Sequence, residues 1–101
     1  MIAVGGELDL ASSPELEGEL ERAFASAPDL LIIDLRQLEF MDSTGLSVIV
    51  RANQHAEEHG CRFAVVKGPP QVDRLLTMTG VADRLALIAA PEELLDSDQP
   101  R

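Results

Sequence analysis

The chain has 101 residues, of which 46% are hydrophobic, and a net charge of −10, so it is long enough for one domain with a single core. It contains three aromatic residues, all Phe, and one lysine, Lys67, which leaves little for stacking on bases or for neutralising phosphates. The composition therefore excludes nucleic acid and an anionic membrane surface as partners, and it favours proteins with a basic face.

Cysteine usage and hydropathy indicate the compartment. Cys61 is the only cysteine, so no internal disulfide can form, as is typical of a reducing environment. No segment reaches the length of a membrane span, and no signal peptide opens the chain. We therefore expect a cytoplasmic protein with no direct membrane insertion.

The first half of the chain alternates extended and helical patterns. Residues 2–4 and 7–10 are short extended stretches separated by two glycines. Ser13-Pro14 then opens a helix, and apolar residues at helical spacing follow it to about residue 27. The strand Leu30–Leu35 is apolar without alternation, which predicts cover on both of its faces.

The second half repeats this alternation. We expect a helix from Ser43 to about His59, ended by Gly60, and a buried strand over Arg62–Val66. A further helix over residues 72–79 and a strand over 85–89 follow, and Pro91 begins a short last helix. These segments predict one domain over residues 1–95, with a polar C-terminal tail over 96–101 that frays.

Alternating strands and helices predict an α/β fold, in which a mixed, mostly parallel sheet of about four strands has helices packed against it. Short connections favour one layer of helices over the sheet. Partners of such sheets usually meet the loops at the carboxyl ends of the strands. The segment over residues 36–43, read as a loop, lies at this edge.

Ser43 lies at the expected start of a helix, between Asp42 and Thr44, with Gly45 directly after. Backbone N–H groups and the helix dipole favour negative charge there, so the position tolerates an added phosphate. The alternative is that Asp42 or Ser43 simply caps the helix, and on spacing alone capping is the commoner reason for either residue.

The sequence resembles the STAS domain, and within it the bacterial anti-sigma factor antagonists. The resemblance covers nearly the whole chain and is most specific where an aspartate, a serine, a small hydroxyl residue and Gly-Leu follow a buried strand. The matching segments are Gly6-Glu7-Leu8-Asp9, Leu31–Leu35, Phe40-Met41-Asp42-Ser43-Thr44-Gly45-Leu46, Gly60–Val66, Pro70–Leu76 and Met78-Thr79-Gly80-Val81.

This resemblance implies a phosphorylation switch. An anti-sigma factor that is also a serine kinase would phosphorylate Ser43, with Thr44 as the second candidate acceptor, and a serine phosphatase would reverse the reaction. The unmodified chain would bind the anti-sigma factor and release the sigma factor for transcription. The expected partner-binding residues are Asp9, Asp42, Ser43, Thr44 and Gly45, and no catalytic activity, cofactor or metal is implied.

The chain departs from the family pattern at one point, and the resemblance leaves one rival function open. Relatives carry a longer first strand, so here that strand is expected to be short or absent, which would leave a sheet edge open to a homodimer. The rival function for this fold is a constitutive subunit of a lipid-transport ABC system or of a stress-signalling scaffold.

The sequence gives little support for an enzyme or for a metal site. No Gly-x-Ser-x-Gly elbow is present, and His55 and His59, four residues apart, lack the glutamate position of a zinc-protease signature. A solvated helix end is the expected role of both histidines.

Overall fold

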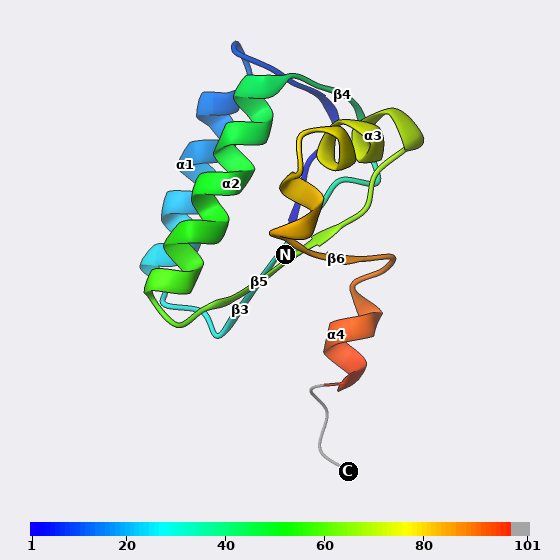
Figure 1. Cartoon of the computed structure of the whole chain (residues 1–101). Helices are drawn as coiled ribbons and strands as arrows, with labels where there is room; N and C mark the ends of the chain where they lie inside the picture. The colour runs from blue at the N-terminus through cyan, green and yellow to red at the C-terminus, as the bar shows by residue number, and fades with distance from the viewer. Residues whose placement is uncertain (98–101) are drawn as a thin grey trace.

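Four parallel strands form the main sheet of the computed structural model, which describes residues 1–97 (Figure 1). Their spatial order is β1 (Ile2–Ala3), β3 (Leu30–Asp34), β5 (Arg62–Val66) and β6 (Ala86–Ile88), and every neighbouring pair is parallel. The α/β class and the mostly parallel sheet of four strands are confirmed.

Both faces of the central strands are covered. Leu31 and Ile33 of β3 belong to the main core, whereas Ile32 of β3 and Ala64 of β5 face the other way and form a smaller cluster. All four side chains are at most 4% exposed. The uninterrupted apolar run of β3 therefore corresponds to a strand buried on both sides, as predicted.

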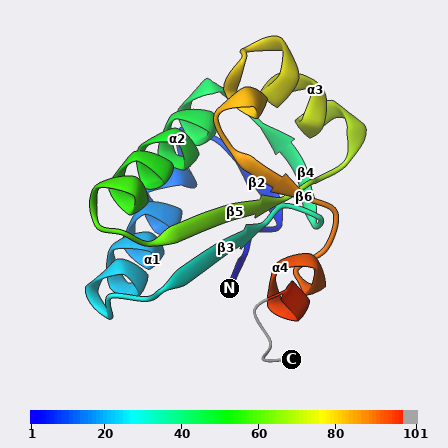
Figure 2. The same cartoon turned by 60° about the horizontal axis from the view of Figure 1, so that its bottom comes forward.

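The helices lie on both faces of the sheet. In Figure 2, α1 (Ser13–Ala25) and α2 (Ser43–Glu58) lie side by side on one face, and α4 (Glu92–Ser97) lies on the other, where Leu94 packs on the smaller cluster. The expectation of a single helix layer is therefore wrong. The difference comes from Ile32, Ala64 and their neighbours, which would otherwise expose an apolar face to water.

The segment over residues 36–43, expected to be a loop, contains a strand. β4 (Leu38–Met41) pairs in parallel with β2 (Gly6–Leu8) as a separate two-stranded sheet, in which Leu8 lies opposite Met41. β4 was missed because it is only four residues long and its burial does not alternate. α3 (Pro70–Met78) contacts β4 and covers it.

The first strand is short, which is one of the two alternatives expected: Ile2 and Ala3 pair with β3, and the backbone N–H of Val4 donates to the Asp34 carbonyl oxygen at 2.9 Å. At the other end, the predicted boundary at residue 95 falls inside α4. The remainder of the predicted tail, 98–101, lies outside the described residues.

Within residues 1–97, no helix combines the length and the apolar composition that crossing a membrane requires.

An ion pair between a buried carboxylate and a half-exposed guanidinium lies at the carboxyl end of β3. Asp34 is 5% exposed and accepts hydrogen bonds from the Arg36 guanidinium, at 2.8 Å from Nη2 and 3.0 Å from Nε, and from the Arg36 backbone N–H. The Arg36 side chain itself is 45% exposed. These hydrogen bonds from Arg36, side chain first, hold the pKa of the Asp34 carboxyl below its ordinary value of 3.8.

We predict that Asp34→Asn lowers the free energy of unfolding by about 2 kcal/mol at pH 7, because charge-assisted hydrogen bonds to a buried group are lost. A lowered folded-state pKa means that Asp34 stabilises the fold above pH 3.8 and that this contribution disappears as the pH falls below that value. Urea unfolding of both proteins between pH 3 and pH 7 measures the difference, which should shrink at the acid end.

The matched control is Asp29→Asn, an exposed carboxyl directly before the same strand, for which we expect a change below about 0.5 kcal/mol. A pH-independent gap between Asp34→Asn and the unsubstituted chain would contradict this account of the ion pair.

Candidate functional site

Asp42 caps α2. Its backbone is extended (φ −105°, ψ −175°), and its Oδ1 accepts hydrogen bonds from the backbone N–H groups of Thr44 at 2.9 Å and Gly45 at 3.1 Å. Two N–H groups that a helix start normally leaves unpaired are thus already bonded. The capping interpretation holds for Asp42, and it leaves Ser43 free of that role.

Ser43 is the first residue of α2, and its side chain is exposed, whereas that of Thr44 is half-buried. The Ser43 carbonyl oxygen accepts a hydrogen bond from the Ser47 hydroxyl at 2.9 Å, one turn further along the helix. Of the two candidate acceptors, Ser43 therefore presents the hydroxyl that an approaching kinase would reach more easily.

Gly45 is buried against β2. A Cβ added to Gly45 would lie 2.6 Å from Leu8 Cγ and 2.7 Å from the Leu8 carbonyl oxygen, closer than atoms can approach without displacement. The absence of a side chain thus lets α2 begin directly on β2. Gly45 is buried and has this packing role, and its predicted contact with the partner stays a prediction.

The loop after β2 lies beside the start of α2. Leu8 is opposite Met41, and its carbonyl oxygen accepts a hydrogen bond from the Asp42 N–H at 3.1 Å. Asp9 directly follows β2, so the structure brings the segments of Asp9 and Asp42 together although 32 residues lie between them in sequence. The predicted site requires the turn at Asp9 and the turn at Asp42 to lie close together, and in the structure they do.

Asp9 organises its own loop. Its Oδ1 accepts hydrogen bonds from the backbone N–H groups of Ser12 at 3.0 Å and Ala11 at 3.1 Å, and the Ser12 hydroxyl lies 3.1 Å away. These hydrogen bonds, above all those from Ser12, hold the pKa of the Asp9 carboxyl below its ordinary value. Asp9 therefore carries a negative charge next to the start of α2 at neutral pH.

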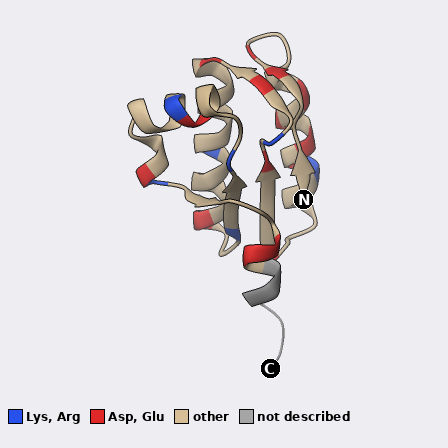
Figure 3. Ribbon diagram, turned by 90° about the vertical axis from the view of Figure 1, so that its right-hand side faces the viewer, with Lys and Arg blue, Asp and Glu red and all other residues tan. Residues whose placement is uncertain are grey.

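The two segments that build this site contain no Lys or Arg. Residues 1–21 and 37–50 include neither Lys nor Arg, but they hold eight carboxylates, and acidic residues predominate over basic ones across the ribbon (Figure 3). A negative group added at Ser43 would meet no Lys or Arg side chain from residues 1–21 or 37–50, and the nearest arginine along α2 is Arg51, which pairs with Glu17 at 3.5 Å. The added negative charge would instead act on a molecule that approaches this surface.

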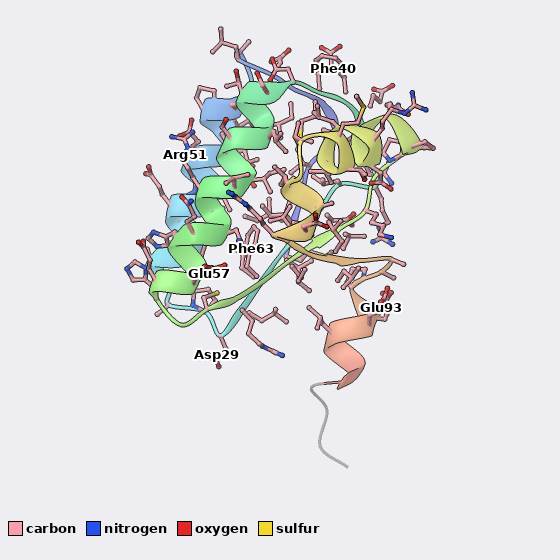
Figure 4. All side chains as sticks on the ribbon, viewed as in Figure 1. Asp29, Phe40, Arg51, Glu57, Phe63 and Glu93 are labelled. Carbon is pink, nitrogen blue, oxygen red and sulfur yellow. The ribbon has the colours of Figure 1, made fainter. Side chains whose placement is uncertain are left out.

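Two exposed apolar side chains beside the site were not identified from the sequence. Leu10, in the loop after β2, is 74% exposed, and Phe40 of β4 is 49% exposed. Figure 4 shows Phe40 at the margin of the molecule, close to the start of α2. The only sequence signal is that both lie next to the acidic turn residues, in stretches where one expects polar side chains.

The histidines lie at the far end of α2. The rings of His55 and His59 are stacked with centroids 4.1 Å apart, and the ring of Phe24 lies 4.4 Å from that of His55. His59 is the C-cap of the helix. No cluster of three or more side chains suited to hold a metal occurs in the part of the chain that the structure describes.

The sequence of this chain is similar to a known protein family and to several characterised proteins. A family model described as "STAS domain" matches residues 1–94. An anti-sigma F factor antagonist of Paenibacillus polymyxa is 32% identical over 82 residues, which span 80% of this chain and 70% of that protein. An anti-sigma-F factor antagonist of Mycobacterium tuberculosis is 26% identical over 95 residues, 94% of this chain and 77% of that one.

A solved structure is also similar. The crystal structure of an anti-sigma factor antagonist from Mycobacterium paratuberculosis superposes with a TM-score of 0.85 at 28% sequence identity. The match covers 94% of this chain and 80% of that one.

We predict that Gly45→Ala lowers the free energy of unfolding by about 1–3 kcal/mol, because the new methyl group has to displace Leu8 and the backbone of β2. Urea denaturation monitored by circular dichroism measures the change. Gly18→Ala in α1 is the matched control, since its Cβ would meet only the far end of Arg22 at 3.4 Å. It should be neutral or stabilising by up to about 1 kcal/mol, and equal stability of the two variants would contradict the packing role of Gly45.

Proposed function

Because the chain belongs to the STAS domain family, as its match over residues 1–94 shows, we propose that it is an anti-sigma factor antagonist switched by phosphorylation of Ser43. The unphosphorylated chain binds an anti-sigma factor that is also a serine kinase, and this binding releases the sigma factor for transcription. Phosphorylation of Ser43 ends the binding, and a serine phosphatase restores it.

One observation carries this proposal: Ser43 is an exposed residue at a helix start that Asp42 has already capped. A phosphate on Ser43 leaves the hydrogen bonds from Thr44 and Gly45 to Asp42 intact, so the fold survives the modification. The positive end of the helix dipole also tolerates negative charge at this position. The modification therefore changes the surface and not the core.

The size of the effect follows from the added charge. A phosphate brings about −1.5 to −2 charges at neutral pH, next to the carboxylates of Asp42 and Asp9. An interface that fits the bare hydroxyl would have to accommodate the extra bulk and bury charge that lacks a partner, which is costly. A loss of a few kcal/mol, about a hundredfold in Kd, is sufficient for a switch.

The remaining parts of the proposal concern the chain as a whole. We infer a binding module without catalytic activity, cofactor or metal, which acts in the cytoplasm. Asp9, Asp42, Ser43 and Thr44 form its contact surface, and Gly45 holds that surface in place. The short strand β1 forms one edge of the main sheet, and homodimer formation through that edge stays a prediction.

We predict that the cognate anti-sigma kinase transfers phosphate from ATP to Ser43. Phosphopeptide mapping by mass spectrometry should find one phosphate on the peptide that contains Ser43. Ser43→Ala should abolish it, whereas Thr44→Ala and Ser47→Ala should retain it. No phosphate on Ser43 or Thr44 with any native kinase partner, together with stable association with a transporter ATPase, would favour the constitutive-subunit function instead.

Charge at position 43 should control affinity. We expect Ser43→Asp to weaken binding to the anti-sigma factor about a hundredfold or more, and Ser43→Ala to bind like the unsubstituted chain. Ser43→Asn is the matched control, since it has the size of the Asp variant without its charge. Isothermal titration calorimetry measures all three, and equal affinities of the Asp and Asn variants would contradict a switch based on charge.

A further inference from the structure

We propose that Leu10 and Phe40 insert into an apolar pocket of the partner and supply much of the binding energy, and that Lys and Arg side chains surround this pocket. Leu10 and Phe40 are called the anchors below. This inference rests on the proposed function and names the chemistry of the same binding surface. Neither residue carries a hydroxyl or a charge, so neither takes part in the phosphorylation itself.

The parallel pairing of β2 and β4 places both residues beside Ser43. Leu8 lies opposite Met41 in the register of the two strands. Leu10 follows Leu8 by two positions, and Ser43 follows Met41 by two positions. Both therefore lie at the same end of the two-stranded sheet of β2 and β4. Phe40 directly precedes Met41 and lies opposite Glu7. Leu10 thus lies in the loop that follows β2, and Phe40 lies on β4, the strand that leads to Ser43.

The exposure of these side chains is unusual within this chain. Among the described residues, four large hydrophobic side chains are exposed, and two of them, Leu10 at 74% and Phe40 at 49%, belong to this one ribbon and its loop. Positions close to them in sequence are buried, since Leu8 is 1% exposed and Met41 is 6% exposed. Exposed apolar groups that gather at a site of interaction are typical anchors of protein interfaces.

Carboxylates surround the two anchors. Glu7 and Glu39 are exposed, and Asp9 and Asp42 are half-buried beside them. No Lys or Arg occurs in residues 1–21 or 37–50, so the charged side chains of the two strands and their adjoining segments are all acidic. A partner with cations around an apolar pocket complements both features, because the charges guide association and the desolvated centre supplies affinity.

The proposed anchors also explain why a phosphate on Ser43 would disturb binding. A phosphate on Ser43 adds negative charge next to the anchors, where the bound partner would exclude water. The partner's cations are already matched to the four carboxylates, and the further charge would stay inside the contact without its own hydration. The anchors thus place Ser43 where its phosphorylation affects binding most.

Binding of the anti-sigma factor kinase by anchor variants tests this inference. We expect Leu10→Ala and Phe40→Ala each to raise Kd about tenfold or more, measured by calorimetry on the full chain. Met78→Ala is the matched control: Met78 is 77% exposed but ends α3, and its substitution should change Kd less than about threefold. Leu10 lies in a loop with its side chain in water, so Leu10→Ala keeps the test valid even if Phe40→Ala lowers stability.

The charged rim has a separate readout. Glu7→Gln combined with Glu39→Gln should slow association and flatten its dependence on salt, with a smaller effect on dissociation. If the unsubstituted chain binds and Ser43→Asp blocks binding, but Leu10→Ala and Phe40→Ala bind normally, the anchors are refuted and the switch stands. If the unsubstituted chain binds no anti-sigma factor, both proposals fail.

Discussion

The backbone hydrogen bond from the Asp42 N–H to the Leu8 carbonyl oxygen (3.1 Å) is the contact on which the rest of the site depends. It extends the pairing of β2 and β4 to the residue that caps α2, and Gly45 then packs on the same Leu8. One residue of β2 thus fixes both the cap and the first turn of the helix. The loop after β2, which holds Asp9 and Leu10, therefore lies beside the end of β4 and the start of α2.

The sequence was sufficient wherever a pattern is local. The apolar run of β3, the alternation of strands and helices, and the start of α2 at Ser43 all appear in the structure as expected. Asp42 caps the helix for a reason that the sequence already contains, namely an acceptor directly before the first turn. The exposure of Ser43 follows from that cap, since the helix begins with its side chain in water.

The features that the sequence did not reveal depend on contacts between distant segments. β4 exists because β2 lies beside it, and four residues that do not alternate cannot indicate this in isolation. The burial of Gly45 requires knowledge of where Leu8 lies, and the exposure of Leu10 and Phe40 becomes meaningful only when the two strands are paired. The position of α4 on the opposite face likewise depends on the packing of Leu94 against Ile32 and its neighbours.

The capping geometry also determines what kind of switch Ser43 can be. If the first-turn N–H groups were free, a phosphate on Ser43 could bond to them and be partly neutralised by its own helix. Asp42 already occupies those of Thr44 and Gly45, and neither strand segment brings a cation. The phosphate charge would therefore stay on the surface at nearly full strength. A switch of this kind requires no movement of the fold, because the partner alone responds to the new charge.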